Sequence, residues 1–356
     1  MIKINIVGDI SLNNIYEDFA RNGKSPFEAV KDVFTSADFN IGNLECLADE
    51  DGYENKLKKP RLKTSPDTLN LLSDLNFNAL NLAHNHIYDA CNAGIACTCN
   101  KLSDLSIGYC GYSQDKRELF VKRFSVKGKY ISIITAVHKD TNPHIPENSG
   151  ITMPFYDVEE IGGHIQSEKK RGNFVIVYLH WGGRTEEGFM PDWYEINDSR
   201  TFIDSGADIV IGGHSHTVQP FEKYKGKYIF YSIGNFCFDD VYSDGVLYPI
   251  GRLRKRRGII VSINVCEEND NYEIKTIPIK NKNAHIYFNP IYRFRILVRN
   301  SVFNILKHSY ILWKINFILF RKLSPLWIYA IENPSPLKVK LSKLSAAKIL
   351  KHFKQK

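Results

Sequence analysis

The sequence predicts an α/β protein. Strand-like apolar runs alternate with helical runs from residue 2 to about residue 107, which is typical of βαβ units with right-handed crossovers and a mostly parallel sheet. Three pairs of strand-like runs follow in the later half, and two of these pairs are joined by Lys-Gly-Lys, which indicates β-hairpins. We therefore expect a mixed sheet, or two sheets packed together, with helices outside.

The elements of the first half follow from the spacing of apolar residues and from the positions of Pro and Gly. In order, we expect a strand to Val7, a helix over residues 26–35, a strand to Ile41, a helix over 66–75, a strand to Leu82, a helix from about Ala90 and a strand near Ile107. The hairpins pair residues 120–126 with 130–137, 219–224 with 228–231, and 258–266 with 272–279. Two segments without periodicity, 46–63 and 139–154, leave from strand ends, where long loops either contact a substrate or simply cross the surface.

Composition and charge divide the chain into two parts. With 356 residues, 43% of them hydrophobic and 24% charged, the chain has the composition of a folded protein and not of a disordered one. Residues 285–356 hold fourteen Lys and Arg and a single acid, Glu332, whereas residues 1–284 hold 33 basic and 38 acidic side chains. We therefore expect a mildly acidic domain over residues 1–284 and a basic amphipathic helical C-terminal extension over residues 285–356.

The basic extension is expected to have a binding partner. Apolar and aromatic residues recur among spaced cations over residues 291–320, and residues 338–356 form a second basic helical candidate. Such stretches lie on anionic membrane surfaces, bind partner proteins such as a synthase, or pack back on an acidic domain, and the sequence leaves these three alternatives open. The acidic main domain argues against nucleic acid as a partner.

Cysteine usage and the N-terminal residues indicate the cytoplasm. The seven cysteines are odd in number and contain no Cys-x-x-Cys pair, so reduced thiols are a simpler interpretation than a disulfide framework. The chain opens as a strand with no signal-peptide pattern, and no apolar run reaches the roughly 20 residues that span a bilayer. We expect a cytoplasmic protein that can attach peripherally to the inner face of the membrane.

Six strand-like runs lead straight into polar or metal-capable residues. These residues are Asp9; Asn43 and Glu45; His84, Asn85 and His86; His180; His214 and His216; and Asn235. In an open α/β sheet, ligands gather beyond the carboxyl ends of the strands, so the pattern predicts one convergent site. Asp, Glu, Asn and His are ligands of hard or borderline divalent cations, although Asn85 taken alone is more simply a turn residue.

Two short motifs carry the clearest metal signal. His214 and His216 follow a strand and a diglycine, and both can face one cation because the glycines let the backbone approach closely. Asp9 and Glu45 offer anionic ligands, and one carboxylate that bridges two cations holds them about 3.5 to 4 Å apart. Each motif has a structural alternative, since an Asp can cap a helix and a His-x-His pair alone is more often not a ligand pair.

Six motifs occur in a characteristic order over residues 2 to about 240. They are Gly8-Asp9; Asn43-Leu44-Glu45; Asn81 to His86 with Asp89; His180-Trp181-Gly182; Gly206-Ala207-Asp208 through His214-Ser215-His216 with Gln219-Pro220; and Tyr231 to Phe236 with Asp239. In order and approximate spacing, these motifs resemble those of the CapA family of capsule and poly-γ-glutamate synthesis proteins. That family is related to the calcineurin-like metallophosphoesterases.

The resemblance implies a four-layer α/β/β/α metallophosphoesterase-like sandwich with a site for two divalent metal ions, Mn, Zn or Fe. The implied ligands are Asp9 and His216 for one metal, Asn85, His180 and His214 for the other, and Glu45 between them. His86 matches the catalytic histidine that contacts the scissile phosphate. The residues that are implied to contact substrate or to support the ligands are Asn43, His84, Asp89 and Asn235.

Departures from the family pattern affect mainly the first metal position. Asp9-Ile10-Ser11 stands where typical phosphoesterases have Asp-x-His, so one histidine ligand is missing, as is usual in CapA proteins. Glu45 replaces the customary Asp, and His84 stands where the family commonly has Asn. The first metal position is therefore expected to be the weaker one.

The resemblance implies a function in cell-envelope polymer metabolism. The leading hypothesis is a metal-dependent hydrolase that cleaves a phosphoester, or another activated ester or amide, during synthesis of capsule, poly-γ-glutamate or a related polymer. The alternative is an accessory or scaffold subunit of a synthesis complex, in which the fold persists without hydrolysis and the basic extension docks to a membrane or synthase. A nuclease is a third hypothesis, and the acidic main domain argues against it.

Overall fold

The computed structural model describes residues 1–251 and 255–319, so the basic helical candidate over residues 338–356 lies outside the described residues. Contacts divide the chain into a unit from Met1 to Ile305 and a second unit from Leu306 to Lys356. The first unit therefore includes residues 285–305 of the predicted extension. It contains both large sheets and all of the predicted site residues.

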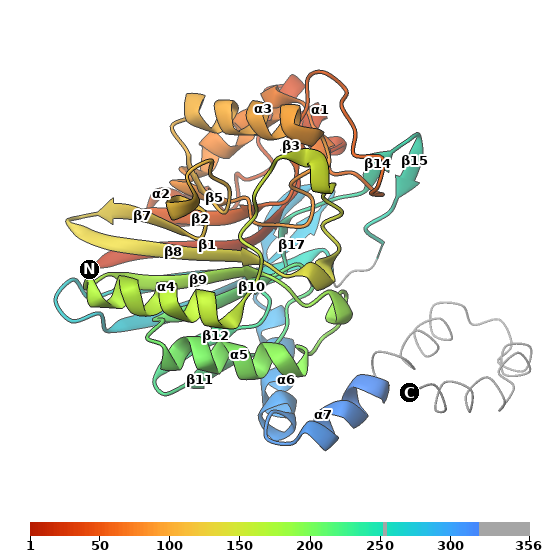
Figure 1. Cartoon of the computed structure of the whole chain (residues 1–356). Coiled ribbons are helices and arrows are strands. Elements are labelled where there is room, and N and C mark those ends of the chain that lie inside the picture. The colour runs from red at the N-terminus through yellow and green to blue at the C-terminus, as the bar shows by residue number, and fades with distance from the viewer. Residues whose placement is uncertain (252–254, 320–356) are drawn as a thin grey trace, which may run out of the picture. The chain divides into compact units, whose positions relative to one another are not determined.

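The larger sheet combines a parallel half and an antiparallel half (Figure 1). Its order is β18 (His285–Phe288), β17 (Tyr272–Lys282), β16 (Arg257–Val265), β1 (Ile2–Ile10), β2 (Phe39–Leu44), β5 (Ala79–Asn81) and β6 (Gly108–Cys110), and β13 (Asn235–Cys237) pairs with β1. Strands β1, β2, β5 and β6 are parallel, whereas β16, β17 and β18 are antiparallel. The predicted alternation of the first half thus forms the parallel half of this sheet.

The second sheet has a parallel centre and antiparallel edges. Its order is β11 (Phe221–Tyr224), β12 (Lys227–Phe230), β10 (Ile209–Gly213), β9 (Phe174–His180), β8 (Lys129–Val137) and β7 (Val121–Val126). The three predicted hairpins are present as β7–β8, β11–β12 and β16–β17. Two small ladders join β3 (Leu47–Ala48) to β4 (Lys63–Thr64) and β14 (Val241–Ser243) to β15 (Val246–Tyr248).

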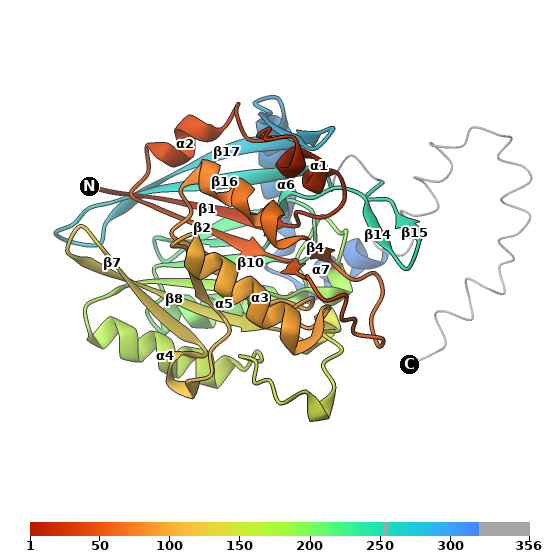
Figure 2. The same cartoon turned by 90° about the horizontal axis from the view of Figure 1, so that it is seen from above.

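Helices cover the outer faces of the two sheets, which gives four layers (Figures 1 and 2). The larger sheet is covered by α1 (Ile15–Arg21), α2 (Lys31–Thr35), the 3-10 helix η1 (Pro66–Leu75) and α3 (Cys91–Asp104), and the second sheet by α4 (Val158–Lys170) and α5 (Trp193–Asp204). This arrangement confirms the expected α/β/β/α sandwich. Short 3-10 helices are η2 (Lys116–Glu118), η3 (Lys139–Thr141), η4 (Glu147–Ser149) and η5 (Gly183–Thr185).

Two helices follow the last strand, α6 (Tyr292–Leu306) and α7 (Tyr310–Phe317). Almost all of α6 belongs to the first unit, and α7 belongs to the second. Within the described part of the chain, every helix is too short or too polar to cross a membrane.

The pleat of β1 changes phase near its end. Ile4 and Ile6 are fully buried in the apolar layer between the sheets, whereas Val7 and Ile10 belong to the core under the helices. Alternate residues of a regular strand face opposite sides, so even-numbered residues cannot all lie on one face here. The register of β1 against β2 shifts between Ile6 and Asp9, which accounts for the change.

The predicted helices of the first half are only partly present. The helix expected over residues 26–35 begins at Lys31, because Phe27 and Val30 insert into the core from turns that precede it. The helix expected over residues 66–75 is the tighter 3-10 helix. Helices α1, α4 and α5 were not predicted, although Asp157 and Asp192 cap α4 and α5 and are readable signals of a helix start.

A buried carboxylate ties α4 to the second sheet. Glu168 on α4 accepts two hydrogen bonds from Arg123, at 2.6 and 2.7 Å, and one from Ser132 Oγ at 2.7 Å. Asn173 Nδ2 also donates to it, at 3.0 Å. Although burial acts to raise it, these donors lower the pKa of Glu168 to about 2.

We expect Glu168→Gln to lower the free energy of unfolding by about 1.5 to 3 kcal/mol, because hydrogen bonds to a charged partner are lost. Urea unfolding at neutral pH measures this difference. Glu160→Gln, at an exposed position on the same helix, is the control and should change the free energy by less than about 0.5 kcal/mol.

The same pair of proteins gives a pH test. Since the pKa of Glu168 is about 2 in the folded chain and 4.5 ordinarily, its stabilising effect is full above pH 4.5 and is lost as the pH falls towards 2. The stability difference between the wild type and Glu168→Gln should therefore shrink over this window. A difference that is constant from pH 6 to about 3 would contradict the role of the charged carboxylate.

Candidate metal centre

The residues predicted to converge meet at one edge of the two sheets. Asp9 of β1 pairs with Asn43 of β2 on one side and with Asn235 of β13 on the other. His180 ends β9 and pairs with Gly213, the last residue of β10. Asp9, Asn43 and Asn235 therefore lie within strands and not beyond strand ends as expected, because β1 and β2 run further than predicted and β13 is a strand of its own.

The change of phase in β1 decides where Asp9 points. A regular pleat would place Asp9 on the helix side together with Val7. Instead, Asp9 Oδ2 accepts the backbone N–H of His214 at 3.2 Å, across the gap between the two sheets. Asp9 Oδ1 accepts from Asn43 Nδ2 at 2.9 Å, so both carboxylate oxygens are oriented.

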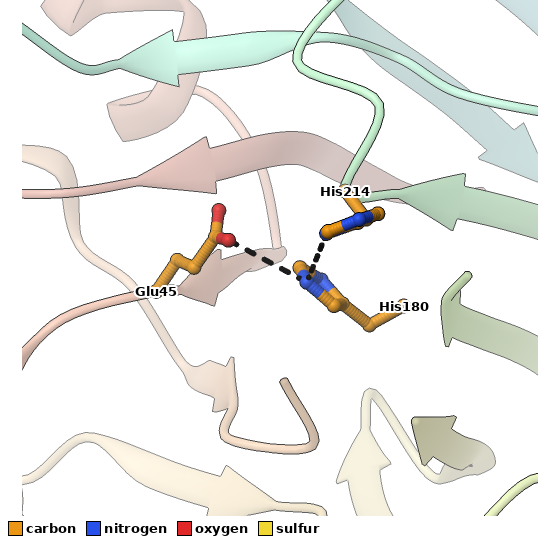
Figure 3. A group of neighbouring side chains, drawn as sticks. All are labelled: Glu45, His180 and His214. Carbon is orange, nitrogen blue, oxygen red and sulfur yellow. Dashed lines mark hydrogen bonds and ion pairs between the residues drawn. The ribbon is translucent and has the colours of Figure 1, made fainter. Parts of the chain in front are cut away.

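Glu45, His180 and His214 form a first group of metal-capable side chains (Figure 3). His180 Nε2 lies 3.5 Å from Glu45 Oε1 and 3.1 Å from His214 Nδ1. Asn85 Oδ1 lies 2.9 Å from the same His180 nitrogen. Two imidazole nitrogens, a carboxylate oxygen and an amide oxygen thus meet around one point, which is a suitable donor set for a borderline divalent cation.

Asp9, Glu45 and His216 form a second group beside the first. His216 Nδ1 lies 3.4 Å from Asp9 Oδ2, 3.9 Å from Glu45 Oε2 and 3.0 Å from Asn235 Oδ1. Glu45 belongs to both groups, as a carboxylate that bridges two ions does. The structure therefore brings together all six residues predicted as ligands.

The environment of Glu45 tests whether a cation fits here. The Glu45 side chain is fully buried, and among the described residues neither of its oxygens has a hydrogen-bond partner. Burial, and then the charge of Asp9, raise the pKa of Glu45. Against the effect of burial, Glu45 and Asp9 raise the pKa of His216 to about 10, so the pocket is strongly negative. A divalent cation would offset the cost of this buried charge, and the residues present fit one.

The two histidines of the His-Ser-His turn have strained backbone conformations. His214 has a φ of 80° and His216 a φ of 55°, a left-handed conformation that is unfavourable for residues other than Gly and that clusters at functional sites. A Cβ atom at Gly212 would lie 2.0 Å from the carbonyl oxygen of Tyr231. The close backbone approach expected of the diglycine is therefore present.

The turn after β5 places a histidine and a carboxylate beside the centre. His84 is fully buried, and its Nδ1 accepts the backbone N–H of His86 at 3.1 Å, so His84 shapes the turn. His86 Nδ1 lies 2.6 Å from Asp89 Oδ2, which also accepts the backbone N–H of Leu62 at 2.6 Å. This pairing orients the His86 ring and leaves Nε2 as the nitrogen that can meet a substrate. Burial lowers the pKa of His86 well below its ordinary value.

Asn43 contacts two of the predicted ligands. Besides its bond to Asp9, its Nδ2 lies 3.2 Å from His180 Nδ1, and its Oδ1 accepts from Asn81 Nδ2 at 3.0 Å. Asn81 was not predicted as a site residue, although it opens the motif that ends in His86. A row of amides therefore fixes the orientation of two ligand side chains.

Lys58 is a second residue that sequence reasoning missed. It lies in the loop over residues 46–63, is 6% exposed, and its Nζ donates to the backbone carbonyls of Asn85 and Asn142, the latter at 3.2 Å. Burial lowers the pKa of Lys58 to about 8. The sequence signal that pointed to this region was the long loop itself, because it begins directly after Glu45. Lys58 joins the two irregular loops to the turn that carries a predicted ligand.

Ser11 does not replace the missing histidine. Its Oγ donates to Asn13 Oδ1 at 2.6 Å and is buried within its own turn. The group around Asp9 therefore has fewer nitrogen donors than the group around His180 and His214. The expectation that the first metal position is the weaker stays a prediction.

Known proteins resemble this chain over its first two thirds. "PGA biosynthesis protein CapA" of Bacillus subtilis is 29% identical over 253 residues, which cover 67% of this chain and 64% of that protein. "Capsule biosynthesis protein CapA" of Bacillus anthracis is 26% identical over 248 residues, 67% of this chain and 60% of that protein. A "Probable polyglutamine synthesis accessory protein" of Mycobacterium tuberculosis is 26% identical over 217 residues, 58% of this chain and 57% of that protein. The chain therefore spans less than two thirds of the length of these relatives.

A solved structure and a family description complete the comparison. The calcineurin-like phosphoesterase YfkN from Bacillus subtilis is similar with a TM-score of 0.42 at 13% identity, over 77% of this chain and 88% of that one. The sequence model of the family "Bacterial capsule synthesis protein PGA_cap" matches residues 3–240, a stretch that contains all eleven predicted site residues. The chain belongs to this family of bacterial capsule synthesis proteins.

Proposed function

We propose that this protein is a metal-dependent hydrolase of phosphoester bonds that acts in the synthesis of capsule, poly-γ-glutamate or a related cell-envelope polymer. The observation that carries the proposal is the buried Glu45 carboxylate, which has no hydrogen-bond partner among the described residues and belongs to two groups of metal-capable side chains. The polymer context is supported by the names of the relatives from the two Bacillus species, which refer to PGA and capsule biosynthesis.

The chain's own residues would divide the work as follows. The ligands would be His180, His214 and Asn85 for one ion, Asp9 and His216 for the other, and Glu45 for both. When bound, two divalent ions supply a water of lowered pKa and stabilise the negative charge that builds on the phosphoryl oxygens.

His86 would handle the proton of the leaving group. Asp89 accepts from its Nδ1 and would stabilise the ring when both nitrogens carry a proton, and it is this protonated form whose Nε2–H can pass to the leaving oxygen. Asn43 keeps Asp9 and His180 in the orientation that the ligands need, and Asn235 does the same for His216.

A second candidate function is that of a non-hydrolytic accessory subunit of a polymer-synthesis complex. One observation favours it: Ser11 stands in place of a ligand histidine and bonds within its own turn, which leaves the Asp9 group with one imidazole where the other group has two. The Mycobacterium tuberculosis relative carries "accessory protein" in its name. In this case the centre would hold one ion for structural purposes, and hydrolysis would be absent.

We expect His214→Ala to lose bound metal and phosphodiesterase activity together, because it removes a donor from the richer group. The loss of metal affinity should exceed the roughly 10- to 100-fold effect of outer partners. Metal content by mass spectrometry and hydrolysis of bis(p-nitrophenyl) phosphate measure the two effects. His308→Ala, at an exposed histidine outside the site, is the matched control and should change neither.

The same variant separates the two candidate functions. Wild-type protein that binds metal tightly but hydrolyses no phosphomonoester or phosphodiester would contradict the hydrolase. If His214→Ala then leaves polymer production in cells intact, the centre has no catalytic part in it and the accessory role stands.

We expect Lys58→Met to weaken metal binding by about tenfold with little change in fold, because Asn85 loses the contact that fixes its backbone. Isothermal titration with Mn²⁺ measures the affinity. Lys59→Met changes the neighbouring exposed lysine, which pairs with Asp244, and is the control. Equal affinities of the two variants would show that Lys58 does not position the ligand turn.

A further inference from the structure

Helix α6 attaches to the first unit by one face. Tyr292, Ile296 and Phe303 are buried, and the ring of Phe303 lies 5.2 Å from that of Tyr231. Asn300 Oδ1 accepts the backbone N–H of Phe221 at 3.1 Å. The helix is therefore held against the β11–β12 edge of the second sheet, as Figure 1 also shows.

The Arg299 side chain takes part in this attachment. Its Nη1 donates to the backbone carbonyl of Val218 at 2.8 Å and to the hydroxyl of Tyr292 at 2.7 Å. Its guanidinium lies 4.0 Å from the ring centroid of Phe189. A half-buried cation with a carbonyl and two aromatic partners fixes the rotation of α6 about its own axis.

The opposite face of α6 is apolar and exposed. We call it the outer stripe, and its residues, with their exposed fractions, are Phe294 (72%), Val298 (46%), Val302 (40%) and Ile305 (67%), together with Ile291 (86%) in the turn just before the helix. Successive members are three or four residues apart, so they form one line along the helix. Leu297, 53% exposed, lies beside it. Because the inner face is fixed to the unit, the stripe faces away from the protein.

The charged side chains of α6 itself are all basic. Arg293 and Arg295 are exposed on α6, and Lys280, Lys282 and His285 line an open hollow of about 400 Å³ on the hairpin that precedes the helix. In the sequence, no Asp or Glu occurs from residue 285 to residue 331. The negative charge that matches these cations must therefore come from the partner of the stripe.

We propose that the outer stripe of α6 docks this protein on an anionic membrane surface. Aliphatic and aromatic side chains bordered by Arg and Lys suit the boundary between lipid headgroups and acyl chains, where each cation adds about 1 kcal/mol near anionic lipid. A protein partner would be expected to find hydrogen-bonding groups within its contact area, whereas all five residues of the outer stripe are apolar. The inference does not depend on hydrolysis at the metal centre.

The test is flotation of the full-length protein with vesicles of phosphatidylcholine, with and without phosphatidylglycerol. We expect binding to the anionic vesicles that weakens as salt is raised. The triple variant Phe294→Ser, Val298→Ser, Ile305→Ser should bind at least about tenfold more weakly. The control is Tyr130→Ser, Tyr242→Ser, Leu247→Ser, which removes three exposed apolar side chains from β8, β14 and β15 and should bind like the wild type.

Three results would overturn the proposal. They are failure of the wild type to bind anionic vesicles, equal binding by the two triple variants, and a wild-type dimer in light scattering that the α6 variant converts to a monomer. The last result would assign the stripe to a second copy of the chain. Circular dichroism confirms folding of each variant, and phosphodiesterase activity in solution should be the same in both triple variants, so failure here is separable from failure of the hydrolase.

Discussion

A carboxylate buried without hydrogen-bond donors is the constraint on which the candidate metal centre of this protein depends. Glu45 is fully buried where the two sheets meet, and a charge in such a place must be matched by opposite charge or be neutralised. The nearest groups are imidazoles and a second carboxylate, Asp9, and of these the pKa of His216 is raised to about 10, so one imidazolium faces two carboxylates. A bound cation would offset this buried charge. The metal hypothesis therefore accounts for the burial of Glu45, whereas a structural role would require hydrogen-bond donors to its oxygens.

The backbone around this edge departs from regular geometry in several places at once. The phase change in β1 turns Asp9 inward, and the left-handed conformations of His214 and His216 turn both rings to the same side. Each departure costs free energy locally. They persist because Gly212 allows the strands to approach and because the amide of Asn43 ties neighbouring ligands together.

Much of the fold and most of the centre could be predicted from the sequence. Strand and helix periodicities, the Lys-Gly-Lys turns and the order of Asp, Asn, His and Glu along the chain are local signals, and the structure confirms the four layers and the convergence of the six predicted ligands. The rest depends on partners far away in the chain. Lys58 is recognisable only once Asn85 lies beneath its loop, and the orientation of Asp9 follows from a register shift that no alternation of residue types records.

The attachment of α6 has a consequence for the histidine turn. Val218, whose carbonyl accepts from Arg299, lies two residues after His216, and the hydroxyl of the intervening Thr217 donates to the carbonyl of Gly188 next to Phe189. The Arg299 guanidinium thus binds the same short segment, residues 216–218, that carries the predicted ligand His216. A displacement of α6 would therefore change the position of His216. Thermodynamic linkage is reciprocal, so binding of a cation at His216 would change the free energy of α6 attachment by the same amount.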